Sequence, residues 1–173
     1  MSPVVEEIRL SLPHIELAAH LSGPEDGVPV IALHGWLDNA NSFARLAPKL
    51  TGLRIVALDL AGHGHSAHRP PGASYSLWDY AFDVLCVAEQ LGWQRFALLG
   101  HSLGAIISGV IAGSFPERVT RMALIDGVMP HTGTQQSTAE RMGQALQAQL
   151  ALRHKRKSVH PTLERGVEAR MKG

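Results

Sequence analysis

Gly100-His101-Ser102-Leu103-Gly104 is the stretch of sequence that decides the fold of this chain. It has the pattern G-x-S-x-G, it follows directly on the apolar run 96–99, and the residues after it have helical periodicity. A serine between a buried strand and a helix, with glycine two positions away on each side, is typical of a sharp turn that holds a hydroxyl out for reaction. The alternative interpretation is that Ser102 only caps the helix.

Working outward from this turn, the chain alternates strands and helices in the manner of a mainly parallel α/β sheet. Short apolar runs, each suited to a strand buried on both faces, lie at 30–33, 55–58, 96–99 and 122–125. Alternating apolar positions at 8–12 and 15–19 predict an antiparallel pair of strands at the start. Strand-helix-strand repetition predicts right-handed crossovers and therefore an α/β fold class.

Two helices are expected between these strands. The first begins after Ser76, which can form a capping box with Asp79, and it ends near Gly92. The second starts at Ser102 and ends at about Ser114, before a proline. Both helices carry an apolar stripe at steps of three and four residues, so each is expected to pack on the sheet.

After Gly127 the strand pattern stops, and two helical segments follow, at 139–152 and after Pro161. We therefore predict a sheet-bearing part, residues 1–127, and a second helical part, residues 128–173.

Composition limits the classes of protein to consider. The chain has 173 residues, of which 45% are hydrophobic, and a net charge of +1, as expected for a globular domain. The sequence has no apolar run long enough to span a bilayer and no leader-like start, so we expect no membrane association and a cytoplasmic location. Its single cysteine, Cys86, excludes an internal disulfide.

Positive charge is concentrated toward the end of the sequence, where residues 140–173 carry eight Lys and Arg against three Asp and Glu. The basic run 153–157 has no interleaved aromatic residues, so we interpret it as a solvated helix end and expect no nucleic-acid partner.

A second motif, His34-Gly35-Trp36, ends the strand predicted at 30–33. Acyl transfer passes through an oxyanion that needs two preorganised hydrogen-bond donors. The backbone N–H groups of Trp36 and Leu103 are the candidate pair, because one donor commonly follows the nucleophile and the other comes from the loop after a neighbouring strand.

The third motif runs from Asp59 to Ser66 and contains His63-x-His65. No further ligand stands at a convincing spacing from the two histidines, so we expect a glycine-rich turn rather than a metal site. The sequence also lacks the glycine patterns that bind nucleotides, and we expect no cofactor.

Together and in this order, the three motifs resemble the α/β-hydrolase superfamily. Residues 34–43, His-Gly-Trp-Leu-Asp-Asn-Ala-Asn-Ser-Phe, look most like the serine hydrolase-like proteins. The resemblance implies a Ser102 nucleophile, a backbone oxyanion hole, and a carboxylic ester or related small acyl compound as substrate. It also implies that residues 128–173 begin a helical cap, and that this sequence corresponds to the N-terminal portion of such a protein, with the last two strands and most of the cap lying beyond it.

The same resemblance places a catalytic histidine after the last strand, and the histidines that follow Ser102 here are poor substitutes. They are His131, His154 and His160. His34 and His101 are expected to be structural, with the His101 side chain on the sheet side of the turn. Asp126, at the end of the strand predicted at 122–125, remains open as the acid of a triad.

A non-catalytic remnant, or a ligand-binding pseudo-hydrolase, is the alternative function, because a serine without a base is a poor nucleophile at neutral pH. An uncovered sheet edge and an exposed apolar cap face would also give low stability or aggregation. The sequence predicts neither the identity of the substrate nor the oligomeric state.

Overall fold

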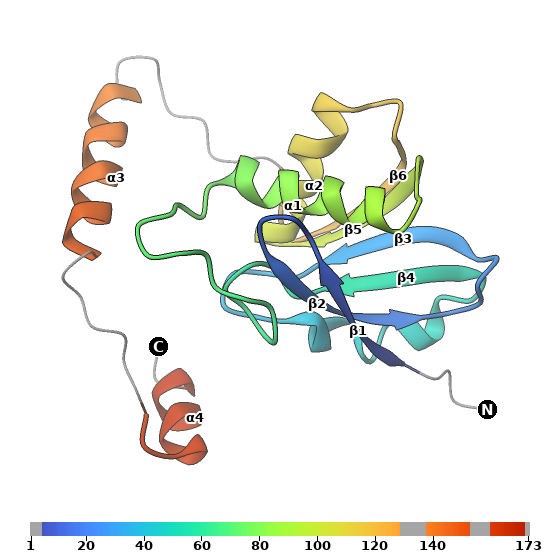
Figure 1. The fold of residues 1–173 in the computed structure, drawn as a ribbon, viewed down its shortest axis with the longest axis horizontal. Helices are drawn as coiled ribbons and strands as arrows, with labels where there is room; N and C mark the ends of the chain where they lie inside the picture. The colour runs from blue at the N-terminus through green and yellow to red at the C-terminus, as the bar shows by residue number, and fades with distance from the viewer. Residues whose placement is uncertain (1–4, 129–137, 153–159, 172–173) are drawn as a thin grey trace. The chain divides into compact units, whose positions relative to one another are not determined.

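Six strands form one sheet in the order β1-β2-β4-β3-β5-β6 (Figure 1). The computed structural model describes residues 5–128, 138–152 and 160–171. The strands are Glu6–Ser11 (β1), Glu16–Ser22 (β2), Val28–Leu33 (β3), Leu53–Leu58 (β4), Phe96–His101 (β5) and Val119–Ile125 (β6). β1 and β2 pair antiparallel, and β2 pairs antiparallel with β4. β4, β3, β5 and β6 run parallel, so the predicted sheet with an N-terminal antiparallel pair is confirmed.

Two helices cover one face of this sheet. α1 spans Leu77–Gln90 and α2 spans Leu103–Ser114. The capping box of α1 is present: the Ser76 hydroxyl accepts a hydrogen bond from the Asp79 N–H, and the Asp79 carboxylate accepts one from the Ser76 N–H. α2 packs on β3, β5 and β6, and α1 packs on α2.

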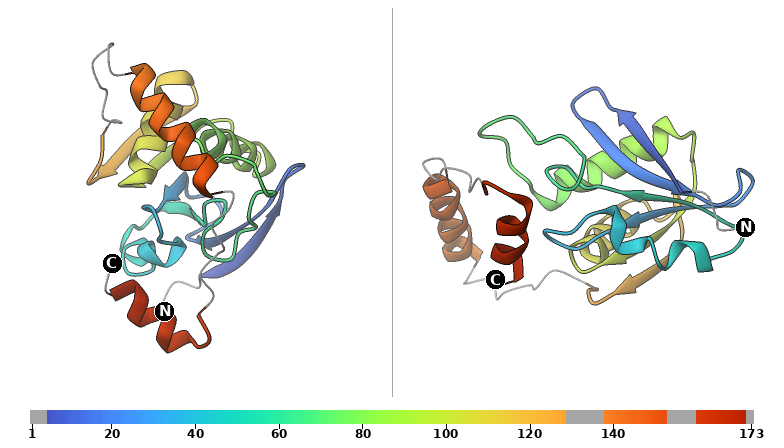
Figure 2. Two further views of the ribbon diagram at one scale, coloured as in Figure 1. Left: turned by 90° about the vertical axis from the view of Figure 1, so that its left-hand side faces the viewer. Right: turned by 90° about the horizontal axis from the view of Figure 1, so that it is seen from below.

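The core has a layer on each side of the sheet. Helices α1 and α2 lie on one of these sides (Figures 1 and 2). The larger layer lies under α1 and α2, and its fully buried side chains include Leu17, Ile31 and Ile107. The smaller layer is closed by two short 3-10 helices, η1 (Ala40–Phe43) and η2 (Ala47–Lys49), where Phe43 packs with Val30. The apolar runs at 30–33 and 55–58 are therefore buried from both sides, as predicted.

The burial of β6 differs from the prediction. The apolar run at 122–125 suggested a strand buried on both faces, but most of β6 is exposed, and Met122 and Ile125 keep 46% and 45% of their accessible surface. The reason is its position: β6 is the last strand of the described sheet and pairs only with β5.

Residues Met1–His131 and Thr132–Gly173 form two separate compact units; the division at 127/128 into a sheet-bearing part and a second helical part stays a prediction. The second unit contains α3, Thr138–Leu152, and α4, Leu163–Met171, which agree with the two predicted helical segments. Along α3, Met142, Leu146 and Leu150 recur every four residues, and all three are exposed. That this unit begins a cap stays a prediction. None of the described helices is both long and apolar enough to cross a membrane.

Candidate active site

Ser102 sits in a strained turn between β5 and α2. Its backbone has φ 49° and ψ −110°, a conformation that L-residues rarely adopt. Its N–H donates to the carbonyl oxygen of Ile125 at 2.9 Å, which ties the turn to the end of β6. The hydroxyl makes no capping hydrogen bond with α2, so the interpretation of Ser102 as a helix cap is not what the structure shows.

The two glycines of the motif allow the turn to form. A Cβ on Gly104 would overlap the carbonyl group of Leu33 on β3. A Cβ on Gly100 would lie 2.5 Å from the carbonyl oxygen of Gly104, inside the first turn of α2. The strand and the helix can therefore approach this closely only because neither residue has a side chain.

Strained backbone conformations occur at the carboxyl ends of the parallel strands. Among the described residues, the non-glycine residues with positive φ are Leu37, Ser102 and Asp126, at 60°, 49° and 52°. They follow β3, belong to the turn after β5, and follow β6, respectively, so all three lie at the carboxyl ends of neighbouring parallel strands. Such strain costs about 1–3 kcal/mol per residue and clusters at functional sites.

The loop after β3 lies directly against Ser102. A Cβ on Gly35 would be 3.4 Å from the Ser102 Cβ, and the Gly104 N–H donates to the His34 carbonyl oxygen at 3.1 Å. Within the described part of the chain, the N–H groups of Trp36 and Leu103 have no hydrogen-bond partner. Two unpaired backbone donors thus belong to the two segments that meet at the serine.

The His34 ring stabilises this loop through two hydrogen bonds. Its Nε2 accepts a hydrogen bond from the Leu60 N–H at 3.0 Å, so its Nδ1 carries the proton and donates to the Gly35 carbonyl oxygen at 2.8 Å. Burial lowers the pKa of His34 and outweighs the opposing hydrogen bond to Gly35, which keeps the ring neutral. His34 is therefore positioned as a structural residue.

The ring of His63 packs against Trp36 in the same loop. The His63 ring lies 5.2 Å from the Trp36 ring in an edge-on arrangement, and its Nδ1 is 3.1 Å from the Ala61 carbonyl oxygen. Its Nε2 is buried without a partner among the described residues. No group of three or more His, Cys, Asp or Glu side chains that could hold a metal ion occurs in that part of the chain.

Asp59 is a residue whose importance the sequence reasoning missed. Its buried carboxylate accepts a hydrogen bond at 2.7 Å from the Ala40 N–H and another at 2.7 Å from the His65 N–H. It therefore joins the loop after β3 to the turn after β4. The available signal was an aspartate placed directly after a buried strand, the same position that Ser102 and Asp126 occupy.

A pocket of about 570 Å³ opens beside the turn at Ser102, and its lining mixes polar residues, Asp38, Asn39, Asn41 and His101, with apolar ones. Burial opposes ionisation of Asp38, but hydrogen bonds from Ser42 and the Asn39 N–H prevail and lower its pKa. The carboxylate is therefore charged at neutral pH.

The structure places the His101 side chain on the face of the sheet opposite α2. Side chains alternate along a strand, so His101 shares a face with Leu99, which belongs to the core layer under η1. Its ring lies against Gly35, where a Cβ would be 3.0 Å from the His101 Nδ1, and it lines the pocket.

Of the remaining candidates for a triad, Asp126 and His160 belong to the described residues. Asp126 is exposed, and its neighbours on each side contact the turn at Ser102: the Ile125 carbonyl oxygen accepts a hydrogen bond from the Ser102 N–H, and a Cβ on Gly127 would lie 2.9 Å from the Ser102 carbonyl oxygen. No described histidine side chain is hydrogen-bonded to Ser102. His131 and His154 lie outside the described residues, as does the basic run 153–157, and His160 belongs to the second unit.

The family to which this sequence is similar agrees with the fold described above. The sequence pattern of the alpha/beta hydrolase fold family matches residues 28–159. The chain is 40% identical over 146 residues to a serine hydrolase-like protein of Danio rerio, which covers 83% of this chain and 45% of that protein. It is 42% identical over 124 residues to a serine hydrolase-like protein of Homo sapiens, which covers 71% of this chain and 61% of that protein.

Among solved structures, the fold matches a hypothetical protein from Pseudomonas aeruginosa PAO1 with a TM-score of 0.91 and 72% sequence identity. The match covers 97% of this chain and 60% of that one. The chain thus spans between about half and three fifths of the length of these relatives.

Proposed function

Since this chain belongs to the alpha/beta hydrolase family, we propose that it carries the nucleophile and oxyanion hole of a serine hydrolase for a carboxylic ester or related small acyl substrate. One observation carries the proposal: Ser102 is held at φ 49° at the start of α2, yet its hydroxyl does not cap the helix. A strained serine whose hydroxyl is left out of the helix cap is what nucleophilic attack requires.

In the proposed reaction, Ser102 Oγ attacks the acyl carbon while a base accepts its proton. The electron pair of the C=O bond moves to oxygen, and the N–H groups of Trp36 and Leu103 stabilise that oxyanion. As the intermediate collapses, the base returns the proton to the leaving oxygen, the alcohol departs and an acyl ester remains on Ser102. Water then attacks this ester, which releases the carboxylic acid and restores the Ser102 hydroxyl. The support for this assignment is that neither N–H group has a hydrogen-bond partner in the part of the chain that the structure describes, and that Gly35 lies against Ser102.

The pocket that His101, the residue before Ser102, helps to line supports a small substrate with both polar and apolar groups. Its charged Asp38 and the amides of Asn39 and Asn41 offer hydrogen-bond acceptors and donors, and Phe43 and Ile125 offer apolar contact. Asp126 remains a candidate for the acid of the triad, and no described histidine is assigned as the base.

A fluorophosphonate probe tests this proposal, because it forms a covalent bond only with an activated serine. We expect the purified chain to be labelled at Ser102, as located by peptide mass spectrometry. Ser102→Ala should abolish the labelling. Ser114→Ala, at the exposed end of the same helix, is the matched control and should leave it unchanged.

The second candidate function is a non-catalytic, ligand-binding chain, and it is favoured by the lack of a histidine bonded to Ser102 among the described residues. If the probe fails to label the chain while it labels a known serine hydrolase in the same buffer, this second function replaces the first for the 173-residue form.

A further inference from the structure

The ring of His63 connects the loop after β3 to the interior of the protein. Its centroid lies 5.2 Å from that of the Trp36 ring, in an edge-on arrangement, and 5.1 Å from that of the His34 ring. The ring of Tyr80, which is fully buried on α1, lies 6.5 Å away. His63 itself is 9% exposed, whereas Trp36 is 59% exposed. A buried ring therefore packs against the residue that carries one of the two proposed oxyanion donors.

The turn after β4 fixes the position of His63. Its N–H donates to the Leu60 carbonyl oxygen at 2.9 Å, and its carbonyl oxygen accepts from the Ser66 N–H at 3.0 Å. The ring is fixed through Nδ1, which lies 3.1 Å from the Ala61 carbonyl oxygen. Since a carbonyl oxygen can only accept, Nδ1 donates this hydrogen bond. The backbone and the ring of His63 are thus both held without any help from Trp36.

The second ring nitrogen of His63 opposes stability. With the proton on Nδ1, Nε2 is a hydrogen-bond acceptor, and it is buried without a partner among the described residues. An unpaired buried acceptor costs about 1–3 kcal/mol. Such exceptions to hydrogen-bond pairing need an explanation, and they are expected at functional sites.

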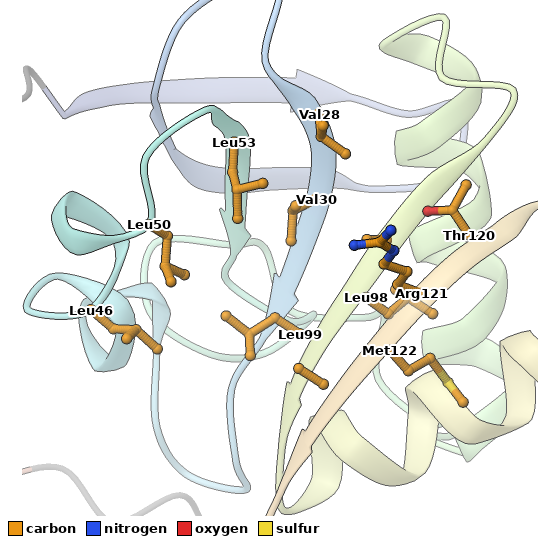
Figure 3. A pocket seen from close by; sticks show the side chains of 12 residues that line it. Val28, Val30, Leu46, Leu50, Leu53, Leu98, Leu99, Thr120, Arg121 and Met122 are labelled. Carbon is orange, nitrogen blue, oxygen red and sulfur yellow. The ribbon is translucent and has the colours of Figure 1, made fainter.

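Trp36 has few other anchors. In the ranges that the structure describes, no other aromatic ring contacts the Trp36 ring, and its indole N–H has no hydrogen-bond partner. The apolar groove of about 580 Å³ on the face closed by η1 and η2 is lined by residues that include Leu46 and Leu50, and Trp36 is not one of them (Figure 3). The contact with His63 is therefore the one that can hold the Trp36 ring.

We propose that His63 is a positioning residue for the oxyanion hole: its ring holds the Trp36 ring and so keeps the Trp36 N–H directed toward the acyl oxygen. This inference rests on the function proposed above. The loop needs such a contact because Leu37, the next residue, has φ 60°. A strained conformation of this kind persists only where surrounding contacts determine it.

Fluorophosphonate labelling of Ser102 at saturating probe tests the positioning role. We expect His63→Ala to lower the rate constant of the bonding step at least about tenfold, because a displaced donor stabilises the developing charge poorly. His63→Phe restores a flat ring and should stay within about threefold of the wild type. His65→Ala, at an exposed histidine of the same turn, is the matched control and should leave the rate constant unchanged.

The labelled fraction separates positioning from a general loss of folding. Misfolding lowers the fraction labelled at the end point, whereas a misdirected N–H lowers the rate constant and leaves that fraction unchanged. If His63→Ala does not fold, Trp36→Ala removes the same contact from its exposed side and should slow labelling equally. The proposal is overturned if the rate constant is unchanged in both alanine variants, or if His63→Phe is as slow as His63→Ala.

Nuclear magnetic resonance of the chain labelled with ¹⁵N-tryptophan tests the contact without any reaction at Ser102. The three signals come from Trp36, Trp78 and Trp93. We expect His63→Ala to lower the heteronuclear NOE of the Trp36 amide alone, and His65→Ala to change none of the three. A Trp36 amide that stays as rigid as in the wild type would overturn the proposal. An unreactive Ser102 would instead overturn the proposed function, and the Trp36 signal would still decide whether His63 holds the loop.

Discussion

At the scale of single residues, Gly104 shows how a sequence motif becomes a steric requirement. The spacing of G-x-S-x-G predicts a tight turn, but only the structure shows what fills the space beside the second glycine. That neighbour is the carbonyl group of Leu33, the last residue of β3. The motif is therefore a condition for packing α2 on the sheet as well as for presenting Ser102.

We expect Gly104→Ala to lower the free energy of unfolding by more than about 2 kcal/mol, because the new methyl group would push α2 away from Leu33. Gly113→Ala is the matched control in the same helix. It meets no atom within 4 Å and should raise the free energy of unfolding by about 0.5–1 kcal/mol. Urea denaturation of both variants checks this, and equal effects would contradict the steric account.

His34 makes stability depend on pH in a specific window. Burial lowers its pKa in the folded protein from the ordinary 6.5, so the unfolded chain takes up a proton first as the pH falls. The stabilisation is complete above pH 6.5 and is lost as the pH falls from 6.5 toward the lowered pKa. In that window its contribution falls by about 1.4 kcal/mol per pH unit.

Urea denaturation at pH 7.5, 6.5 and 5.5 measures this effect. We expect His34→Gln to have a shallower loss of stability between pH 6.5 and 5.5 than the wild type. His68→Gln, at an exposed histidine, should keep the wild-type slope. Parallel slopes for wild type and His34→Gln would show that His34 is not the titrating group.

At the scale of elements, a buried carboxylate on α1 connects this helix to two other segments, and no sequence motif predicted that role. Asp83 is 1% exposed and accepts hydrogen bonds from His14, in the turn between β1 and β2, at 2.8 Å and from Arg69, in the loop before α1, at 2.6 Å. A buried charge with two charged or polar partners couples three segments that are far apart in the sequence.

Asp83→Ala should therefore lower the free energy of unfolding by about 3–5 kcal/mol, because Arg69 would lose its carboxylate while its side chain stays mostly buried. Glu89→Ala is the matched control on the same helix. It removes an ion pair with Arg118 in which the Glu89 side chain is 58% exposed, and it should cost less than about 1 kcal/mol. A loss below about 1 kcal/mol for Asp83→Ala would contradict the proposed coupling.

β6 illustrates the limit of predicting an element from its own residues. The run Met122-Ala123-Leu124-Ile125 identified a strand, and the structure confirms it. Burial was predicted wrongly because it depends on which elements cover the strand, and periodicity within the strand carries no information about them.

At the scale of the whole molecule, exposed apolar surface occurs in both units. Met122 and Ile125 are exposed on β6, and Met142, Leu146 and Leu150 are exposed on α3. We expect the isolated chain to unfold below about 60 °C, or to aggregate on heating, because this surface contributes no burial energy. A circular dichroism melt measures this, and a sharp, reversible transition above that temperature would contradict it.

The strands, the helices, the capping box of Ser76 and the position of Ser102 were all predictable from the sequence alone. Each depends on residues within a few positions of one another, where propensity, spacing and the turn chemistry of glycine operate. The family resemblance came from the same local motifs, and the match to residues 28–159 confirms it.

The tertiary structure alone decided which groups meet. Asp59 bonds Ala40 across 19 residues, Asp83 bonds His14 across 69, and His101 lies against Gly35 on the face of the sheet opposite α2. These contacts form between segments whose separation in sequence carries no spacing signal, because they are set by strand order and by the side of the sheet to which each residue points. The turn that carries the proposed nucleophile Ser102 is thus a property of local sequence, whereas the loop against it, the strained neighbours and the nearby pocket are properties of the folded sheet.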